Sequence, residues 1–176
     1  MKSPIIAFPL VLVGGMIVAL AQSAADAKLQ AQLKQLFPAA TSFSPKEGEL
    51  PHFKAFIKDP AAPQPALAGL VFWTTELQPL ERGYEGPIKM LVGMDTKGVL
   101  TGVIVVEHKE PYGDFSVEPP SFAAQFKSKN IRDPFRVGGD IDAVSTATIT
   151  MTSATRAIRN GARRLARQLL TPEGPK

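Results

Sequence analysis

The sequence predicts a single α+β domain in which helices pack against an antiparallel sheet, preceded by one N-terminal hydrophobic segment. Three apolar, β-prone runs at residues 66–75, 88–94 and 99–107 predict strands. Apolar residues at helical spacing in residues 29–37 and 156–169 predict helices on either side of these runs. About 150 residues remain after the N-terminal segment, which is the size of one ordinary domain.

Residues 1–27 have the features of a targeting segment. They open with Lys2, continue through an apolar stretch at residues 5–21, and end in Ala-Asp-Ala, a small-x-small pattern that signal peptidase accepts. The segment therefore predicts export, as a cleaved signal peptide or as a membrane anchor, because its length is marginal for crossing a bilayer. A buried hydrophobic helix of the fold is the remaining alternative.

The rest of the chain divides into three predicted parts. Residues 28–80 form an N-terminal helix, which Pro38 ends, and an irregular or strand region of the same domain. Within this part, residues 41–65 are rich in Pro, Ser, Lys and Glu, and we expect an irregular surface segment with little function. Residues 81–170 form the core of the domain, and residues 171–176 form a tail.

A hairpin and a loop lie within that core. The last two apolar runs flank a turn at residues 95–98, Asp-Thr-Lys-Gly, in which Gly98 is expected to adopt a positive φ. The polar, proline-broken loop at residues 108–120 follows, and ligand contacts concentrate on such loops. Ser121 is the expected N-cap of a helix at residues 122–127.

The composition excludes several classes of function. Without cysteine, the chain holds no disulfide, iron–sulfur cluster, c-type haem or thiolate metal site. His52 and His108 lie far apart in no metal-binding motif, so we expect no metal. Five C-terminal arginines account for the net charge, which falls from +4 to −1 (4 − 5) without them, so no nucleic-acid-binding surface is expected. These are Arg156, Arg159, Arg163, Arg164 and Arg167.

The arginines belong to the predicted C-terminal helix. Its apolar face consists of Ile158, Ala162, Leu165 and Leu169, and the arginines project from other sides of the helix. They form either a solvated face or a contact surface for anionic lipid headgroups or an acidic redox partner.

A stretch rich in hydroxyl side chains, Asp142 to Ser153, DAVSTATITMTS, precedes this helix. The start of a helix offers unpaired backbone N–H groups and the positive end of the helix dipole, which suit a phosphate. Hydroxyl groups there can donate to phosphate oxygens, or one of them can be esterified. From the residues alone, a strand followed by an N-cap remains the alternative.

The motif D-x-x-S-T-A-T within this stretch resembles the D-x-x-[S/T]-G-A-T flavinylation motif of the FMN-binding domain family. It consists of Asp142, Ser145, Thr146, Ala147 and Thr148. The family includes the G subunit of the Rnf complex, the C subunit of the sodium-pumping NADH:quinone reductase and the periplasmic domain of NosR-type regulators.

Further stretches resemble the family in the same order along the chain. Residues 83–88 are similar to its G-Y-x-G-x-I pattern, and residues 92–99 to its V-G-x-D and G-x-I hairpin entry. Residues 108–111 are similar to the start of its H-x-E-T-P-G-L-G loop, and residues 125–127 to the start of its Q-F-x-G-K pattern.

The resemblance implies that a flavin transferase takes FMN from FAD and joins its phosphate to Thr148. It implies an FMN-binding domain fold and an electron carrier, rather than an enzyme with its own small-molecule substrate, on the periplasmic side of the bacterial inner membrane. Membrane-bound or periplasmic redox proteins are the implied partners. The implied cofactor-binding residues are Thr148, Asp142, Ser145, Thr146, Ala147, Thr150, His108, Glu110 and Tyr112.

Two departures from the family pattern affect the expected site. Thr146 stands where the family commonly has glycine, so easy access to positive φ is lost and we expect a loop of different shape. Residues 111–114, Pro-Tyr-Gly-Asp, replace T-P-G-L-G and bring the ring of Tyr112 near the expected flavin. Trp73 and Tyr84 are further candidates for flanking the flavin ring, with ordinary packing as their alternative.

Two other functions remain open at this point. A non-redox accessory or sensory subunit of a membrane respiratory complex would keep the fold without flavin, and the Thr146 departure is its main support. An exported binding protein for a phosphorylated ligand would use the same helix start without covalent attachment.

Overall fold

The computed structural model describes the backbone of residues 12–58 and 61–170, and the side chains from residue 24 onward within those ranges. The chain divides into two units, residues 1–32 and 33–176. Helix α1 (Leu12–Leu36) contains the described residues of the first unit. Its residues 33–36 belong to the second unit. No helix in the described part of the chain has both the length and the apolarity of a membrane span. The predicted targeting segment lies mostly outside the residues whose side chains are described.

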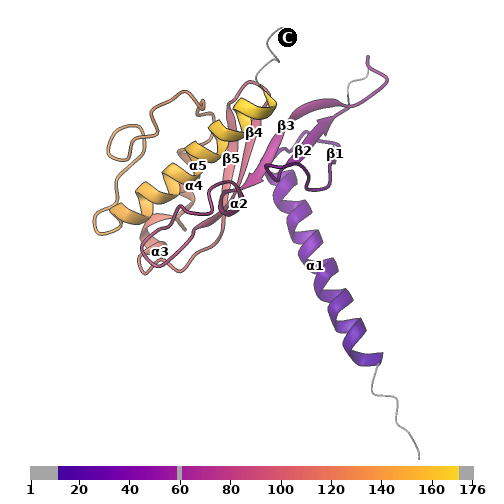
Figure 1. Ribbon diagram of the computed structural model, residues 1–176, viewed down its shortest axis with the longest axis horizontal. Coiled ribbons are helices and arrows are strands. Elements are labelled where there is room, and N and C mark those ends of the chain that lie inside the picture. The colour runs from indigo at the N-terminus through magenta and orange to yellow at the C-terminus, as the bar shows by residue number, and fades with distance from the viewer. Residues whose placement is uncertain (1–11, 59–60, 171–176) are drawn as a thin grey trace, which may run out of the picture. The chain divides into compact units, whose positions relative to one another are not determined.

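The second unit is built on a five-stranded antiparallel sheet with the strand order β1-β2-β3-β4-β5 (Figure 1). Each strand pairs with the next along the chain, so every connection within the sheet joins neighbours. With the helices that accompany it, the sheet confirms the predicted α+β class. The strands are β1 (Ser42–Phe43), β2 (Phe53–Ile57), β3 (Ala66–Trp73), β4 (Lys89–Asp95) and β5 (Leu100–Glu107).

The expectation of an irregular segment at residues 41–65 is wrong, because β1 and β2 lie within it. Phe53 and Ala55 alternate with less buried neighbours and point into the core. The backbone of β2 pairs with β3, and Phe53 stands opposite Val71. Pairing with β3 therefore gives this polar, proline-containing segment its structure.

The hairpin of β4 and β5 confirms the prediction for the centre of the chain. Val92 stands opposite Val103 in its ladder. In the turn, the Asp95 carboxylate accepts hydrogen bonds from the N–H groups of Lys97 and Val99, both at 2.8 Å. Gly98 has a φ of 79°, as the turn requires.

Four further helices complete the described part of the second unit. The expected N-cap Ser121 is wrong, because the helix already begins at Pro120 with Pro119 as its N-cap residue. Proline suits the first helical position, where its missing N–H has no intrahelical partner to lose. The helices are α2 (Thr74–Leu77), α3 (Gly113–Ser116), α4 (Pro120–Ala124) and α5 (Thr148–Leu169).

The long helix α5 lies against the sheet, and the main core fills the space between them (Figure 1). Three members of its predicted apolar face are buried, whereas Leu169, in the last turn, is 40% exposed. At Gly161 the helix passes so close to Phe72 of β3 that a Cβ atom would lie 2.6 Å from the ring carbon Cε2. The buried members are Ile158, Ala162 and Leu165.

This close approach gives a prediction for Gly161→Ala. Alanine improves helix propensity by about 1 kcal/mol, but the added methyl must displace the buried Phe72 ring, and such overpacking costs about 1–3 kcal/mol. We therefore expect a net loss of about 1 kcal/mol in the free energy of unfolding, measured by urea denaturation. Gln168→Ala, at an exposed position of the same helix, should leave it unchanged or slightly raised. If Gly161→Ala also left the free energy of unfolding unchanged or raised, as expected for Gln168→Ala, the close contact with Phe72 would be contradicted.

Candidate functional site

The motif residues lie at the start of α5. The helix begins at Thr148, with Ala147 as the N-cap residue and no side-chain hydrogen bond to cap it. Ser145 and Thr146 precede the helix, whereas Thr150 and Thr152 lie inside it. The expected order, in which the hydroxyl-rich stretch ends before the helix, is therefore wrong, and the strand-plus-cap alternative is not found.

Thr148 occupies the first position of α5, where its side chain is exposed. The backbone N–H groups of the first helical turn have no intrahelical acceptor, and the positive end of the helix dipole adds to them. Met151 is the first residue of the helix whose N–H pairs in the regular pattern, with the Ala147 carbonyl at 2.9 Å. An anion bonded to the Thr148 hydroxyl would thus lie next to unpaired donors.

A cavity of about 320 Å³ opens beside Thr148. One wall comes from residues 146–150 and the other from Tyr84 together with Pro111 and Tyr112. The residues Tyr84 and Tyr112 are 65% and 48% exposed, so the cavity has an aromatic rim open to solvent. Five of the sequence-predicted residues meet here, namely Thr146, Ala147, Thr148, Thr150 and Tyr112.

Glu110 joins the two walls of this cavity, although it does not line it. Its buried carboxylate accepts hydrogen bonds from the N–H groups of Tyr84 at 2.8 Å and Glu85 at 3.0 Å. It also accepts one from the Thr150 hydroxyl in the first turn of α5. A Cβ atom at position 83 would lie 2.4 Å from the Glu110 Oε1 atom, which explains the glycine there.

Thr146 adopts a φ of 71°. The threonine thus adopts a positive φ although it lacks the easy access to that region that glycine has. The left-handed conformation is costly for a β-branched side chain and persists where the surroundings impose it. The residue takes up the backbone conformation that glycine reaches easily.

Three predicted site residues lie away from the cavity. Asp142 is exposed, and its N–H donates to the Gln125 side chain at 2.6 Å. Ser145 precedes the cavity wall. His108 accepts from the Glu110 N–H at 3.1 Å and lies 3.0 Å from a Glu118 carboxylate oxygen, so its contacts organise the loop.

The cavity also contains residues that the sequence did not single out as binding residues. Pro111 and Ile149 line it, and Ile149 is 57% exposed although it is apolar. The sequence did contain a signal for Ile149, because it is an apolar residue at the second position of the helix and lies outside the apolar face of that helix. Trp73 does not line the cavity, and its ring lies under the Lys89 ammonium at 5.0 Å.

The region around the cavity is similar to known proteins. Residues 83–163 match the FMN-binding domain family. The chain is 28% identical over 171 residues to the G subunit of the ion-translocating oxidoreductase complex of Pseudomonas aeruginosa PAO1, covering 88% of this chain and 80% of that protein. The protein of the same name from Vibrio vulnificus YJ016 is 32% identical over 88 residues, which cover 44% of this chain and 42% of that protein.

The matched range contains every residue that lines the cavity, together with Glu110 and the whole motif around Thr148. Residues 83–163 thus resemble the FMN-binding domain family, and the chain resembles the G subunits of ion-translocating oxidoreductase complexes.

Proposed function

We propose that this chain is a flavoprotein subunit that carries FMN and passes electrons within a membrane-associated redox complex. The relatives that match most of its length are named as subunits of an ion-translocating oxidoreductase complex. The observation that carries the proposal is the exposed residue Thr148, which lies both at the start of α5 and on the wall of a cavity with an aromatic rim.

The size and lining of the cavity fit the ring system of a flavin. Its volume of about 320 Å³ is at the lower end of the range of about 300–1,000 Å³ for small-molecule pockets. The cavity therefore suits a planar ring rather than a whole nucleotide, and the phosphate would stay outside at the helix start. Tyr84 and Tyr112 offer aromatic surface to the ring. When bound, a flavin supplies reversible electron transfer.

Thr148 is the proposed attachment point. In the reaction that the transferase would catalyse, the Thr148 oxygen attacks the flavin-side phosphorus of FAD. The bond from that phosphorus to the bridging oxygen breaks, AMP leaves with the bonding electron pair, and the hydroxyl proton passes to a base. The product is a phosphodiester between FMN and the threonine. The exposure of Thr148 supports access for a separate enzyme.

The start of α5 would stabilise the remaining negative charge of that phosphodiester. Anions near a helix N-terminus gain about 0.3–1 kcal/mol from the dipole, in addition to hydrogen bonds from unpaired N–H groups. The helix thus favours a phosphate, while a covalent bond prevents loss of the cofactor by dissociation.

We further propose that the domain works on the periplasmic side of the inner membrane, with membrane-bound or periplasmic redox proteins as partners. Residues 1–27 would direct export and either stay as an anchor or be cleaved. Residues 28–80 and 81–170 would fold as one domain, the second range as the FMN-binding core, with residues 171–176 as a tail. The non-redox alternative rested on Thr146, and the positive φ of that residue removes its main support.

The attachment site is tested by Thr148→Val in cells that also produce a flavin transferase. Valine keeps the shape of threonine but has no oxygen to esterify, so we expect complete loss of the flavin fluorescence that otherwise survives on a denaturing gel. Intact mass should show loss of the FMN-sized increment. Ser145→Ala is the matched control and should only reduce the yield. An increment that persists in Thr148→Val would refute the assignment.

The conformation of Thr146 gives a second prediction, for Thr146→Gly. Relief of the strained φ is worth about 1–3 kcal/mol, against a glycine entropy cost of about 0.5–1 kcal/mol. We expect the free energy of unfolding to rise by about 1 kcal/mol and flavinylation to be retained. Ser145→Gly, next to it without a positive φ, should instead lower the stability. If the free energy of unfolding fell equally in Thr146→Gly and Ser145→Gly, the backbone strain at Thr146 would be contradicted.

The role of Glu110 is tested by Glu110→Gln. The NH₂ group of the glutamine amide cannot accept a hydrogen bond from a backbone N–H. One buried hydrogen bond is therefore lost, which lowers the free energy of unfolding by about 1–3 kcal/mol. We expect a lower unfolding midpoint and, in the flavinylated protein, an altered visible absorption spectrum of the flavin. Glu85→Gln, with an exposed side chain, should change neither. An unchanged spectrum and midpoint in Glu110→Gln would show that the carboxylate does not hold the cavity walls.

A further inference from the structure

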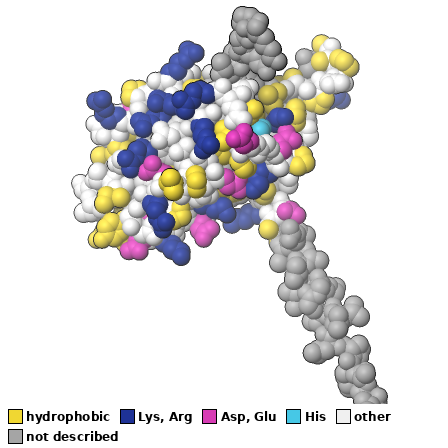
Figure 2. Space-filling view, in the orientation of Figure 1, with side chains coloured by type: hydrophobic (Ala, Val, Ile, Leu, Met, Phe, Trp, Pro, Cys, Tyr) yellow, Lys and Arg dark blue, Asp and Glu magenta, His cyan; other side chains and the backbone are white. Residues whose placement is uncertain are grey.

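Beyond the cavity, α5 carries the arginines that the sequence placed on a solvated face, and Lys and Arg side chains gather over this helix (Figure 2). Only part of that expectation holds. Arg163 donates to the carbonyl groups of Ile131 at 2.6 Å and Asp133 at 2.7 Å, and is partly buried. Arg164 donates to the Leu77 carbonyl at 3.0 Å. These two arginines fasten other segments to the helix.

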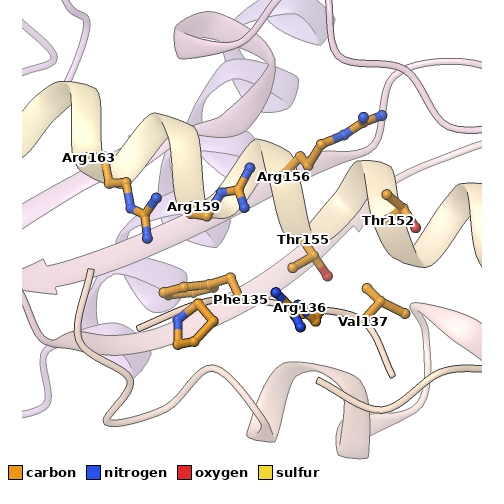
Figure 3. Close-up of a pocket in the computed structure, with 9 residues that line it drawn as sticks. Phe135, Arg136, Val137, Thr152, Thr155, Arg156, Arg159 and Arg163 are labelled. Atoms are coloured by element: carbon orange, nitrogen blue, oxygen red, sulfur yellow. The ribbon is translucent and has the colours of Figure 1, made fainter. Parts of the chain in front are cut away.

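A groove of about 510 Å³ runs between α5 and the segment 134–137 (Figure 3). Thr152, Thr155 and the arginines Arg156, Arg159 and Arg163 come from the helix side. Arg136 comes from the opposite wall, and Figure 3 shows the Thr155 side chain directed from the helix toward it. Four arginines therefore line one groove.

The positive charge of this groove is only partly neutralised. Arg156 forms an ion pair with Glu81 at 3.0 Å, but Arg159 has only a neutral contact, from its Nε to Asn160 at 3.1 Å. In the part of the chain that the structure describes, no carboxylate pairs with Arg159 or Arg136. Burial and the neighbouring charges of Arg159 and Arg167 lower the pKa of Arg163, as expected for crowded like charges.

Thr155 adds a second, independent sign of a missing ligand. The residue is 1% exposed, and among the described residues its hydroxyl oxygen has no hydrogen-bond partner. A buried hydroxyl without a partner costs free energy, so such groups are rare in folded proteins. Thr155 and Arg159 are four residues apart on a helix and therefore share one face. The Thr155 hydroxyl, which has no hydrogen-bond partner, and the Arg159 guanidinium, which has no carboxylate partner, thus line the same groove.

The opposite wall is held in a fixed shape by Asp140. Its carboxylate accepts from the N–H groups of Phe135 at 3.0 Å and Arg136 at 2.5 Å, and pairs with Lys129 at 3.0 Å. Burial raises the pKa of Asp140, but the hydrogen bonds from Arg136, Lys129 and Phe135 outweigh it and hold the pKa at about 2. The wall that carries Arg136 therefore keeps its anchor at all physiological pH values.

We propose that this groove binds a phosphate group, held by the guanidinium groups of Arg136 and Arg159 and by the Thr155 hydroxyl. The donors come from both walls, which suits a tetrahedral anion with oxygens in several directions better than a planar carboxylate. Arginine matches phosphate oxygens with paired N–H donors. The groove is separate from the flavin proposal, because Thr155 lies seven residues, about 10 Å, further along α5 than Thr148.

The first experiment titrates the whole 176-residue chain with inorganic phosphate and follows the melting temperature, with NaCl at matched ionic strength as the reference. We expect a saturable rise with phosphate that NaCl does not give. Thr155→Val and Arg159→Gln should each weaken the apparent affinity roughly tenfold. Arg167→Gln removes the same charge from the same helix outside the groove and should retain binding.

Thr155→Val separates binding from folding. Because valine fills the same space and removes an unpaired buried hydroxyl, its melting temperature without phosphate should equal or exceed that of the unchanged protein. A phosphate response that persists unchanged in Thr155→Val, or that equals the NaCl response, would overturn the proposal. An affinity loss in Arg167→Gln as large as in Arg159→Gln would also overturn it, because it would indicate a general charge effect.

A second experiment distinguishes the sources of the phosphate. Co-sedimentation with vesicles of phosphatidylglycerol is compared with co-sedimentation with vesicles of phosphatidylcholine. Binding through the N-terminal apolar segment contributes to both, so the difference between them reports on the headgroup. Extra binding to phosphatidylglycerol that phosphate displaces and Thr155→Val reduces would support a lipid headgroup. Phosphate binding without it would support a soluble phosphate ester. If phosphate did not bind, and polyglutamate bound the unchanged protein but not Arg159→Gln, the proposal would be overturned in favour of an acidic protein segment.

Discussion

The candidate site depends on one buried carboxylate. Glu110 accepts hydrogen bonds from Tyr84 and Glu85, which precede it by 26 and 25 residues, and from Thr150, which follows it by 40. Burial of an ionised carboxylate is costly unless donors surround it, so these segments stabilise one another only when all are in place. The loop that presents Tyr84, the loop that presents Tyr112 and the start of α5 are thereby brought together around the cavity.

Much of the fold follows from local sequence patterns. The β4–β5 hairpin was predictable from two apolar, β-prone runs on either side of an Asp-Thr-Lys-Gly turn. The buried face of α5 was predictable from apolar residues at helical spacing. By contrast, β1 has two residues, and β2 owes its structure to β3 beyond the proline-containing segment between them. No local pattern encodes such pairing. The start of α4 was missed for a smaller reason, since Pro120 competes with Ser121 as a helix-start signal.

For the site, the sequence located the motif, its threonine and the two tyrosines of the opposite wall, Tyr84 and Tyr112, but it did not single out Pro111 or Ile149. Pro111 and Ile149 carry no chemical signal of their own, and only the fold brings them together. Thr146 shows the limit of residue preferences, because the surrounding structure imposes a φ that threonine avoids. Helical spacing likewise predicted that the arginines leave the apolar face, but it cannot show which of them find partners elsewhere in the fold.

The course of α5 has a consequence for electron exchange. The helix is continuous from Thr148 to Leu169, and Gly161 seats it directly on Phe72 of the sheet. Between the proposed attachment residue and the rigid body of the domain there is thus no hinge in the helix. A cofactor tethered there could tilt at its own linkage but could not shuttle. If electrons are delivered to two sites that lie further apart than this linkage can reach, the entire domain has to move between them.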